Sequence, residues 1–279
     1  MESQAIHAFA AKAHVRAFTI VELLVVIGIV ALLVALLAPA LSSMKESSGE
    51  TRCASNLRQI GIATINYVSL HGNCLPQQKV TIAPGTETVI GALFGGKKGQ
   101  LPAYDINVVG ADKRPLNKYL TGGSAFGPDS EVPVFECPLD RGQPPHPFLP
   151  QTDSMYDFIG TSYNLNDHTL NSESCTTLVP QFTGTRPGGK MPGVADPTKT
   201  WMIADIPVYN YQDDNQNGVA DDDRLQRWHF KTARVNMCFV DGHIGVGIDL
   251  TKGLENTART YTFLPSPNWN CGNPPVPQP

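Results

Sequence analysis

The sequence predicts an α+β protein in which a long N-terminal transmembrane-plus-stem helix packs on a mainly antiparallel sheet with loop-rich insertions. Three observations predict this class. An apolar run covers residues 18–38, apolar side chains recur at helical spacing over residues 57–68, and two β-prone segments flank Asp241-Gly242. A helical run of that length crosses a hydrocarbon core of about 30 Å, and an Asp-Gly pair between β-prone segments is a strong hairpin signal.

The apolar run is interrupted only by Thr19 and Glu22, and Lys12 and Arg16 precede it. Positive charge on this side predicts a cytoplasmic N-terminus and an extracytoplasmic remainder. No clear small-residue cleavage site of the secretory type follows the run. An ionisable residue costs roughly 2.5–3.5 kcal/mol at the centre of a spanning helix, so Glu22 either has a function or snorkels at the membrane boundary.

Beyond the membrane the helix is predicted to continue from Ser42 to about Leu70 as an amphipathic stem. The side chains that recur at helical spacing are Leu57, Ile60, Thr64, Tyr67 and Val68. Residues 42–55 are polar and weakly periodic, which predicts an exposed neck. Strands are predicted at residues 88–94, 200–204, 235–240 and 243–248, and irregular insertions at residues 95–160 and 170–200.

Composition restricts the class of protein further. Charged residues make up 16% of the chain, which has 25 Gly and 23 Pro, so a loop-rich globular domain is expected rather than a helical bundle. The net charge of −4 gives no argument for nucleic-acid binding, and no nucleic-acid partner is expected. Residues 265–279 are dense in proline and are predicted to form an extended tail.

Six cysteines in an oxidising compartment predict disulfides. The candidates are Cys53, Cys74, Cys137, Cys175, Cys238 and Cys271. Their connectivity is left open, except that Cys53 with Cys74 is disfavoured. Cys53 precedes the expected helix end by roughly 25 Å, whereas bonded cysteines have Cα atoms within about 7 Å. Metal binding by these thiols is the poorer alternative because the sequence has no C-x-x-C pair.

The segment of residues 213–223 is the best candidate for an ion site. Oxygen-bearing residues alternate with others, and Gly218 stands at the sixth position, as in a loop that wraps Ca²⁺. The predicted ligands are the side chains of Asp213, Asn215 and Asn217, the carbonyl of Val219, and Asp221. Arg224 stands where an EF-hand has its glutamate, so another carboxylate would have to complete the shell. A solvated acidic turn explains the same composition.

An enzyme is the less favoured class. Several histidines lie in or near expected loops, and Asp241 stands close to His243. The sequence has no H-E-x-x-H, G-x-S-x-G, phosphate-loop or dinucleotide motif. Loop packing or hairpin hydrogen bonds explain the histidines without catalysis, so no catalytic residue is assigned.

Residues 17–23, AFTIVEL, resemble the cleavage and methylation motif of type IV prepilins and type II secretion pseudopilins. The resemblance implies that a prepilin peptidase cuts between Ala17 and Phe18 and methylates the new amine. Glu22 is then the fifth mature residue, and Pro39 falls where family members commonly carry a helix-kinking proline. Glu22 is expected to pair with the N-terminal ammonium of a neighbouring subunit. The family prefers Gly before the cut, where this chain has Ala17.

Residues 52–72 resemble a large bacterial family of pseudopilin-like proteins of unassigned function, through RCASNLRQIG, NY and HG. That family ends in a signature of His, nine residues and Asp-Gly. The corresponding residues here are His229, Asp241 and Gly242, with eleven residues between. We expect this signature to tie the preceding loop to the hairpin. Residues 135–138 and 161–166 extend this resemblance along the chain. The Ca²⁺ prediction gains support from the resemblance to secretion pseudopilins, which often hold Ca²⁺ near the C-terminal sheet.

Together these predictions divide the chain into a cleaved leader (1–17), a membrane helix (18–41), a stem (42–72), a globular domain (73–264) and a tail (265–279). The expected function is that of a structural subunit in the bacterial cytoplasmic membrane. Its expected partners are the prepilin peptidase, other pilin or pseudopilin subunits, the secretion or pilus assembly machinery and the lipid bilayer. The alternative is a membrane-tethered binding protein, calcium-dependent or not, that does not polymerise.

Overall fold

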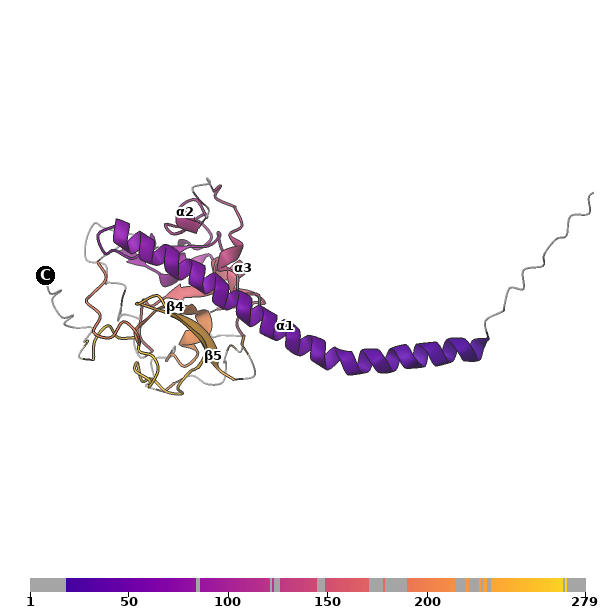
Figure 1. Ribbon diagram of the computed structural model, residues 1–279. Coiled ribbons are helices and arrows are strands. Elements are labelled where there is room, and N and C mark those ends of the chain that lie inside the picture. The colour runs from indigo at the N-terminus through magenta and orange to yellow at the C-terminus, as the bar shows by residue number, and fades with distance from the viewer. Residues whose placement is uncertain are drawn as a thin grey trace, which may run out of the picture. The chain divides into compact units, whose positions relative to one another are not determined.

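A computed structural model describes residues 19–83, 86–120, 122, 126–144, 149–170, 178, 190–213, 219–220, 226, 228–229, 232–267 and 269. The chain forms two compact units, residues 1–45 and 46–279, and each is described by itself. The predicted α+β class is confirmed (Figure 1): a long N-terminal helix is combined with antiparallel sheets. Most of the predicted tail lies outside the described residues.

Helix α1 (Ile20–Leu70) is continuous over 51 residues and ends where the sequence predicts. It is the one helix of the described residues that is long and apolar enough to span a membrane. In the first unit every side chain of α1 is exposed. The helix continues through Pro39, which has no N–H to donate to the preceding turn.

The part of α1 in the second unit is built into the globular core. Leu57, Ile60 and Thr64 are buried, as predicted for the stem. The predicted exposed neck at residues 42–55 is wrong from Gly49 onward, because Gly49, Glu50 and Cys53 are also buried. Their burial depends on a close approach of Leu139 to Gly49, an ion pair and a disulfide, none of which produces an apolar period in the sequence.

The main sheet is antiparallel, in the order β3-β4-β5-β6. Its strands are β3 (Tyr163–Leu165), β4 (Trp201–Asp205), β5 (Arg234–Phe239) and β6 (Ile244–Asp249). The predicted hairpin is therefore confirmed, and Gly242 in its turn has φ +89, which favours glycine.

A second, two-stranded sheet pairs β1 (Lys79–Ala83) with β2 (Thr86–Val89). The strand predicted at residues 88–94 is wrong beyond Val89, because Gly91–Phe94 forms a buried 3₁₀ turn, η1. A short apolar run fits a buried strand and a buried turn equally well. The remaining 3₁₀ turns are η2 (Ala103–Asp105), η3 (Pro133–Phe135) and η4 (Ile206–Tyr209), and the short helices are α2 (Asn117–Leu120) and α3 (Met155–Ile159).

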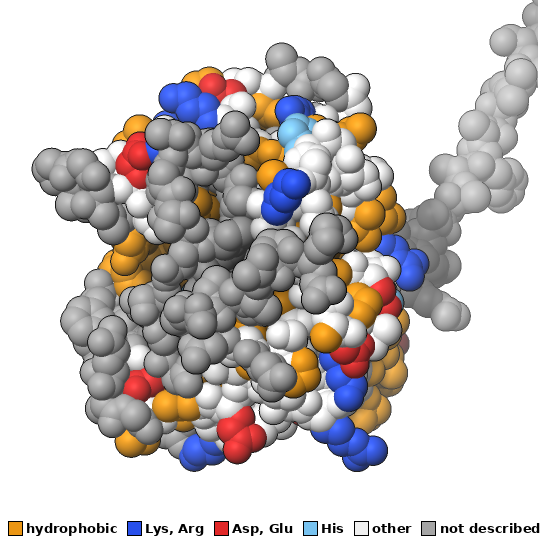
Figure 2. All heavy atoms as spheres, turned by 90° about the vertical axis from the view of Figure 1, so that its left-hand side faces the viewer, with side chains coloured by type: hydrophobic (Ala, Val, Ile, Leu, Met, Phe, Trp, Pro, Cys, Tyr) orange, Lys and Arg blue, Asp and Glu red, His pale blue; other side chains and the backbone are white. Residues whose placement is uncertain are grey.

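Alternate side chains of the main sheet enter two buried clusters. Ile203 and Cys238 pack with Leu57 and Ile60 of α1 in the larger cluster. The smaller cluster joins the other residues of β5 and both ends of the bulged segment 201–204 of β4 to the C-terminal segment. Its members include Trp201, Met237, Phe239, Tyr261 and Phe263. The sheet is thus covered by α1 on one face and by the chain after β6 on the other. Figure 2 shows acidic, basic and hydrophobic side chains interspersed on one side of the molecule.

Candidate functional site

The start of α1 carries a capping box, which joins Thr19 and Glu22. The N–H and the hydroxyl of Thr19 each donate to Oε2 of Glu22 at 2.9 Å, and the N–H of Glu22 donates to the Thr19 hydroxyl at 3.1 Å. This reciprocal arrangement satisfies donors that a helix start otherwise leaves unpaired. The T-x-x-E spacing in the sequence is its signal. The predicted processing residues, Ala17 and Phe18, lie outside the described residues.

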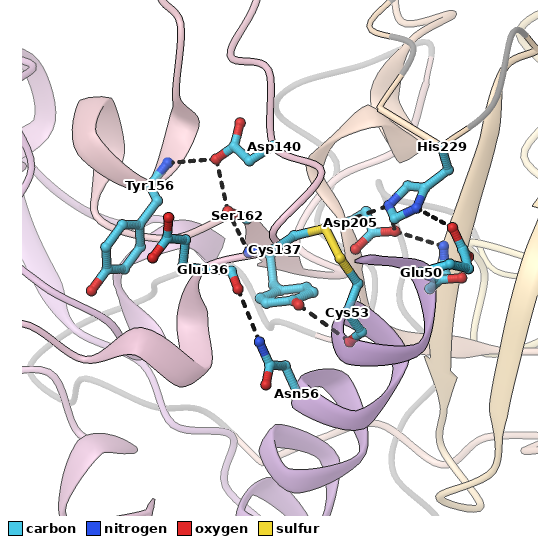
Figure 3. The surroundings of a disulfide bond; sticks show 12 residues. Glu50, Cys53, Asn56, Glu136, Cys137, Asp140, Tyr156, Ser162, Asp205 and His229 are labelled. Carbon is cyan, nitrogen blue, oxygen red and sulfur yellow. Dashed lines mark hydrogen bonds and ion pairs between the residues drawn. A yellow bond between two sulfur atoms is a disulfide. The ribbon is translucent and has the colours of Figure 1, made fainter. Parts of the chain in front are cut away.

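The second feature is a disulfide between Cys53 of α1 and Cys137, which follows η3. A further bond joins the same two segments, since the Asn56 amide donates to the carbonyl of Glu136 at 2.9 Å. The Tyr163 hydroxyl of β3 also donates to the carbonyl of Cys53 at 3.2 Å and so ties β3 to α1. Figure 3 shows Asn56 and Glu136 beside the two cysteines. The stem of α1 is therefore fastened covalently to a loop of the globular domain.

A network of hydrogen bonds holds the Cys137 loop in place. The N–H of Cys137 donates to the Ser162 hydroxyl at 3.1 Å, and that hydroxyl donates to Oδ2 of Asp140 at 2.7 Å. Asp140 also accepts the N–H groups of Met155 and Tyr156 at the start of α3. Burial raises the pKa of Asp140, although these hydrogen bonds act in the opposite direction. The segments 135–138 and 161–166, which the resemblance singled out, thus meet here.

Next to the disulfide, His229 lies between two carboxylates (Figure 3). Its Nδ1 is 2.5 Å from Oε2 of Glu50 on α1, and its Nε2 is 2.8 Å from Oδ2 of Asp205 at the end of β4. Asp205 also accepts the N–H of Asn236 at 2.7 Å. Trp228 fixes the chain before His229, since its indole N–H donates to the carbonyl of Gly142 at 2.9 Å. We call Glu50, Cys53, Cys137, Asp205 and His229 the His229 cluster.

Burial by itself would lower the pKa of His229, but the charge and hydrogen bond of Asp205, followed by those of Glu50, outweigh it and raise the pKa to about 10. His229 is therefore an imidazolium at neutral pH, and each ring N–H donates to a carboxylate. Burial, with Asp205 as a secondary cause, also raises the pKa of the neighbouring Tyr163 well above its ordinary value. The tyrosine stays a neutral hydrogen-bond donor.

Two carboxylate oxygens of the His229 cluster, Oε1 of Glu50 and Oδ1 of Asp205, are buried without a hydrogen-bond partner among the described residues. The ligand-type atoms of Cys53, Cys137 and His229 lie within 4.8 Å of one another and are buried. Three side chains of the types that can ligate a metal ion are thus gathered at one point of the core, two of them joined as the disulfide.

The predicted signature residues take two separate roles. His229 pairs with Glu50 and Asp205, as described above. Asp241 instead accepts the backbone N–H of His243 at 3.1 Å and pairs with its ring Nδ1 at 2.6 Å. The His243 ring stacks on Phe239, with ring centroids 4.3 Å apart. Asp241 and Gly242 therefore close the β5–β6 turn.

The predicted calcium loop falls largely outside the described residues. Asp213 is buried and Val219 is exposed, while Asn215, Asn217 and Asp221 are not described. The Ca²⁺ site therefore stays a prediction.

Of the candidate cysteines, Cys53 pairs with Cys137 and not with Cys74, in agreement with the argument from helix length. Cys74 and Cys238 carry free thiols, and burial raises the pKa of Cys238 to about 12. Cys175 and Cys271 lie outside the described residues.

Comparisons with known protein families, with curated proteins and with solved structures found no match to this chain. The geometry of α1 and of the His229 cluster therefore carries the functional argument.

Sequence reasoning missed Glu50 and Asp205. Glu50 precedes Cys53 by less than one helical turn, so both side chains point to the same face of α1. That spacing was a usable signal for Glu50. Asp205 ends a strand of otherwise apolar residues, and a lone carboxylate at that place indicates a buried polar partner.

Proposed function

We propose that this chain is a pseudopilin-like structural subunit, cleaved before Phe18, anchored in the cytoplasmic membrane and assembled through α1 into a filament of the type II secretion or type IV pilus kind. The observation that carries the proposal is the division of α1. One continuous helix exposes its apolar side chains over residues 20–41 and buries a face in the globular domain from Gly49 onward.

The exposed apolar part of α1 has to be shielded from water. A contiguous apolar surface of this length is unstable in water, and it is covered either by lipid or by other helices. A membrane supplies lipid before assembly, and neighbouring copies of α1 supply apolar helices after it. The stem then carries the globular domain on the outside of the filament.

Glu22 is suited to set the register between subunits. Both hydrogen bonds from Thr19 go to Oε2, so Oε1 is available to a donor outside this helix. In an apolar surrounding an unpaired carboxylate is costly, and a neighbouring cation offsets that cost. The N-terminal ammonium that cleavage before Phe18 would create is such a cation.

The proposal is tested by intact-mass measurement of the protein extracted from membranes of its own host, with and without the prepilin peptidase. We expect an N-methylated species that begins at Phe18, and its loss when the peptidase is absent. A chain that keeps residues 1–17 in both strains would contradict the proposal and favour the membrane-tethered binding protein.

Assembly is tested separately with Glu22→Gln, which removes the charge and keeps a hydrogen-bond acceptor for Thr19. We expect this variant to be inserted and cleaved, with at least a tenfold lower yield of sheared filaments. Glu46→Gln is the matched control, since Glu46 is an exposed carboxylate of the same helix whose Arg141 pair spans 4.0 Å; exposed pairs contribute little. Equal filament yields from Glu22→Gln and Glu46→Gln would contradict a role of Glu22 in assembly.

A further inference from the structure

The His229 cluster gathers three donor groups at one point in the core, the thiols of Cys53 and Cys137 and the ring of His229, and Asp205 adjoins the same ring. Nε2 of His229 lies 3.7 Å from Sγ of Cys137 and 2.8 Å from Oδ2 of Asp205. Sγ of Cys53 completes the set, since the ligand atoms of the two cysteines and His229 lie within 4.8 Å of one another. All four residues are buried, and they come from α1, the Cys137 loop, β4 and the loop before β5.

We propose that the dithiol form of this chain binds one zinc ion between Cys53, Cys137, His229 and Asp205, and that the metal ion and the disulfide are alternative cross-links at the same place. Thiolate sulfur, imidazole nitrogen and carboxylate oxygen are the ligand atoms that zinc takes, and structural zinc sites are four-coordinate and tetrahedral. Soft thiolate ligands disfavour Ca²⁺ and Mg²⁺.

The distances fit such a site. Zinc bonds of ~2.3 Å to sulfur and ~2.0–2.2 Å to nitrogen or oxygen place two ligand atoms of one tetrahedron about 3.3–3.8 Å apart. The separation of 3.7 Å between Cys137 Sγ and His229 Nε2 already falls in this range. The separation of 2.8 Å between His229 Nε2 and Asp205 Oδ2 belongs to the hydrogen bond that the metal would replace.

Glu50 supplies the outer support that such a histidine needs. Its Oε2 lies 2.5 Å from Nδ1 of His229, on the ring edge opposite the sulfur atoms and Asp205. A metal-bound histidine typically donates its second N–H to a carboxylate, which fixes the ring and its tautomer. Glu50 therefore serves as a positioning residue, and Nε2 is the atom left for the ion.

The unpaired oxygen of Asp205 is an independent sign of an unfilled site. Asp205 is fully buried, and its Oδ1 has no hydrogen-bond partner. A buried carboxylate oxygen without a partner is costly. Coordination of a cation by this carboxylate would offset that cost.

The chemistry of the exchange balances in both directions. Zinc binding to the dithiol form releases three protons, one from each thiol and one from Nε2 of the imidazolium. Oxidation of the zinc-bound dithiolate to the disulfide releases the ion and transfers two electrons to a disulfide-class oxidant, which takes two protons from water to become a dithiol, while Nε2 of His229 takes up one proton. The reverse step takes two electrons and two protons from a dithiol reductant. The newly made chain, before oxidation, is the form that binds metal.

The test uses the full-length chain in detergent micelles with Cys74→Ser, Cys175→Ser and Cys271→Ser, so that Cys53, Cys137 and the buried Cys238 remain. The protein is reduced with a phosphine under anaerobic conditions and titrated with Co²⁺, which reports tetrahedral thiolate ligation by its visible and charge-transfer absorption. We expect one Co²⁺ per chain in the reduced protein, displacement by Zn²⁺, and no binding to the oxidised protein.

Variants of the same background then assign the ligands. Cys53→Ser and His229→Gln should each weaken Co²⁺ binding at least 100-fold, and Asp205→Asn should change the absorption spectrum. Glu50→Gln should weaken binding 10–100-fold and leave the spectrum unchanged. Far-UV circular dichroism with and without metal shows which variants are folded. If Cys53→Ser does not fold, the Co²⁺ spectra and affinities of the Asp205→Asn and Glu50→Gln proteins still test the ligand assignment.

Two results would overturn the proposal. One is that the reduced chain with only the three serine substitutions binds no stoichiometric Co²⁺, folded or not. The other is unchanged binding in both Cys53→Ser and His229→Gln, which would place the ion elsewhere. An unchanged spectrum in Asp205→Asn would remove Asp205 from the ligand set.

Discussion

His229 is a buried cation held by two buried carboxylates from distant parts of the chain. Glu50 belongs to α1 and Asp205 to β4, and both pair with the same ring. Because removal of one partner leaves uncompensated buried charge, such groups are strongly coupled to the folded state. The cluster therefore makes stability depend on the protonation of a single imidazole.

This coupling predicts a loss of stability in the alkaline range. The pKa of His229 is raised to about 10 from an unfolded value of about 6.5. The stabilising contribution is thus complete below about pH 6.5 and is lost as pH rises through about 10. Denaturant unfolding of the oxidised full-length chain, followed by fluorescence from pH 6 to pH 10.5, should show this fall.

The groups that face His229 are Glu50, Asp205 and the disulfide, so the pH effect can be assigned by substitution. His229→Gln should cost about 3–5 kcal/mol of unfolding free energy at pH 7 and flatten the alkaline dependence. His243→Gln is the control, since His243 is half exposed and pairs with Asp241 in the hairpin turn. An unchanged alkaline slope in His229→Gln would contradict this account.

Single residues were predictable from the sequence only where their signal is local. Glu22 stands out as a charge in an apolar run, and Gly242 as a turn glycine. The pair of Glu50 and His229 joins positions 179 residues apart, and no periodicity links them. The individual histidine was identified, but its partners could not be.

At the scale of elements, α1 approaches the sheet closely because small residues face it. A Cβ added at Gly61 would lie 2.5 Å from Sγ of Cys238 on β5, and one added at Gly49 would lie 2.6 Å from Leu139. Real Cβ atoms do not approach this closely, so the two glycines set how near the helix lies to its neighbours.

Gly61→Ala should therefore destabilise the fold by about 1–3 kcal/mol through overpacking, although alanine favours an exposed helix by ~1 kcal/mol. Denaturant unfolding of the full-length chain measures this loss. Ser55→Ala, on the exposed face of α1, is the control and should be neutral or slightly stabilising.

A double-mutant cycle tests whether the contact with Cys238 causes the loss of stability in Gly61→Ala. In the background of Cys238→Ala, which removes the sulfur, Gly61→Ala should cost less than it does alone. Strict additivity of the two changes would show that the close approach at Cys238 is not the source of the loss.

The long helix and the β5–β6 hairpin could be predicted because their signals lie within the elements themselves. The apolar run, the helical period of the stem and the Asp-Gly turn are each local. The 3₁₀ turn η1 could not be predicted, because Gly91 is fixed by a bond from its N–H to Asp167, 76 residues away. The prediction of an exposed neck at residues 42–55 was wrong for a similar reason, because the burial of Gly49, Glu50 and Cys53 depends on Leu139, His229 and Cys137, which are distant in sequence.

At the scale of the whole molecule, the disulfide closes a sequence separation of 84 residues. A cross-link over so long a segment restricts the unfolded chain strongly, and its loss should cost about 3–5 kcal/mol. We expect this decrease for Cys53→Ala with Cys137→Ala, measured by denaturant unfolding with the fluorescence of the buried Trp201 and Trp228. Cys74→Ala, which removes a free thiol, should stay within about 0.5 kcal/mol of the wild type.

The continuity of α1 also determines how the globular domain would take up mechanical force. A pull on the N-terminal half travels along one uninterrupted helix. Beyond the exposed pair of Glu46 and Arg141, this helix is held to the domain at Gly49, Glu50 and Cys53. There the S–S bond would divert tension into the Cys137 loop, so the chain between the two cysteines is bypassed. The bypassed segment contains β1 and β2, so this strand pair would be spared from unzipping, whereas β3 to β6 follow Cys137 and would stay in the path of the force. In the reduced chain the force would pass through all of these strands.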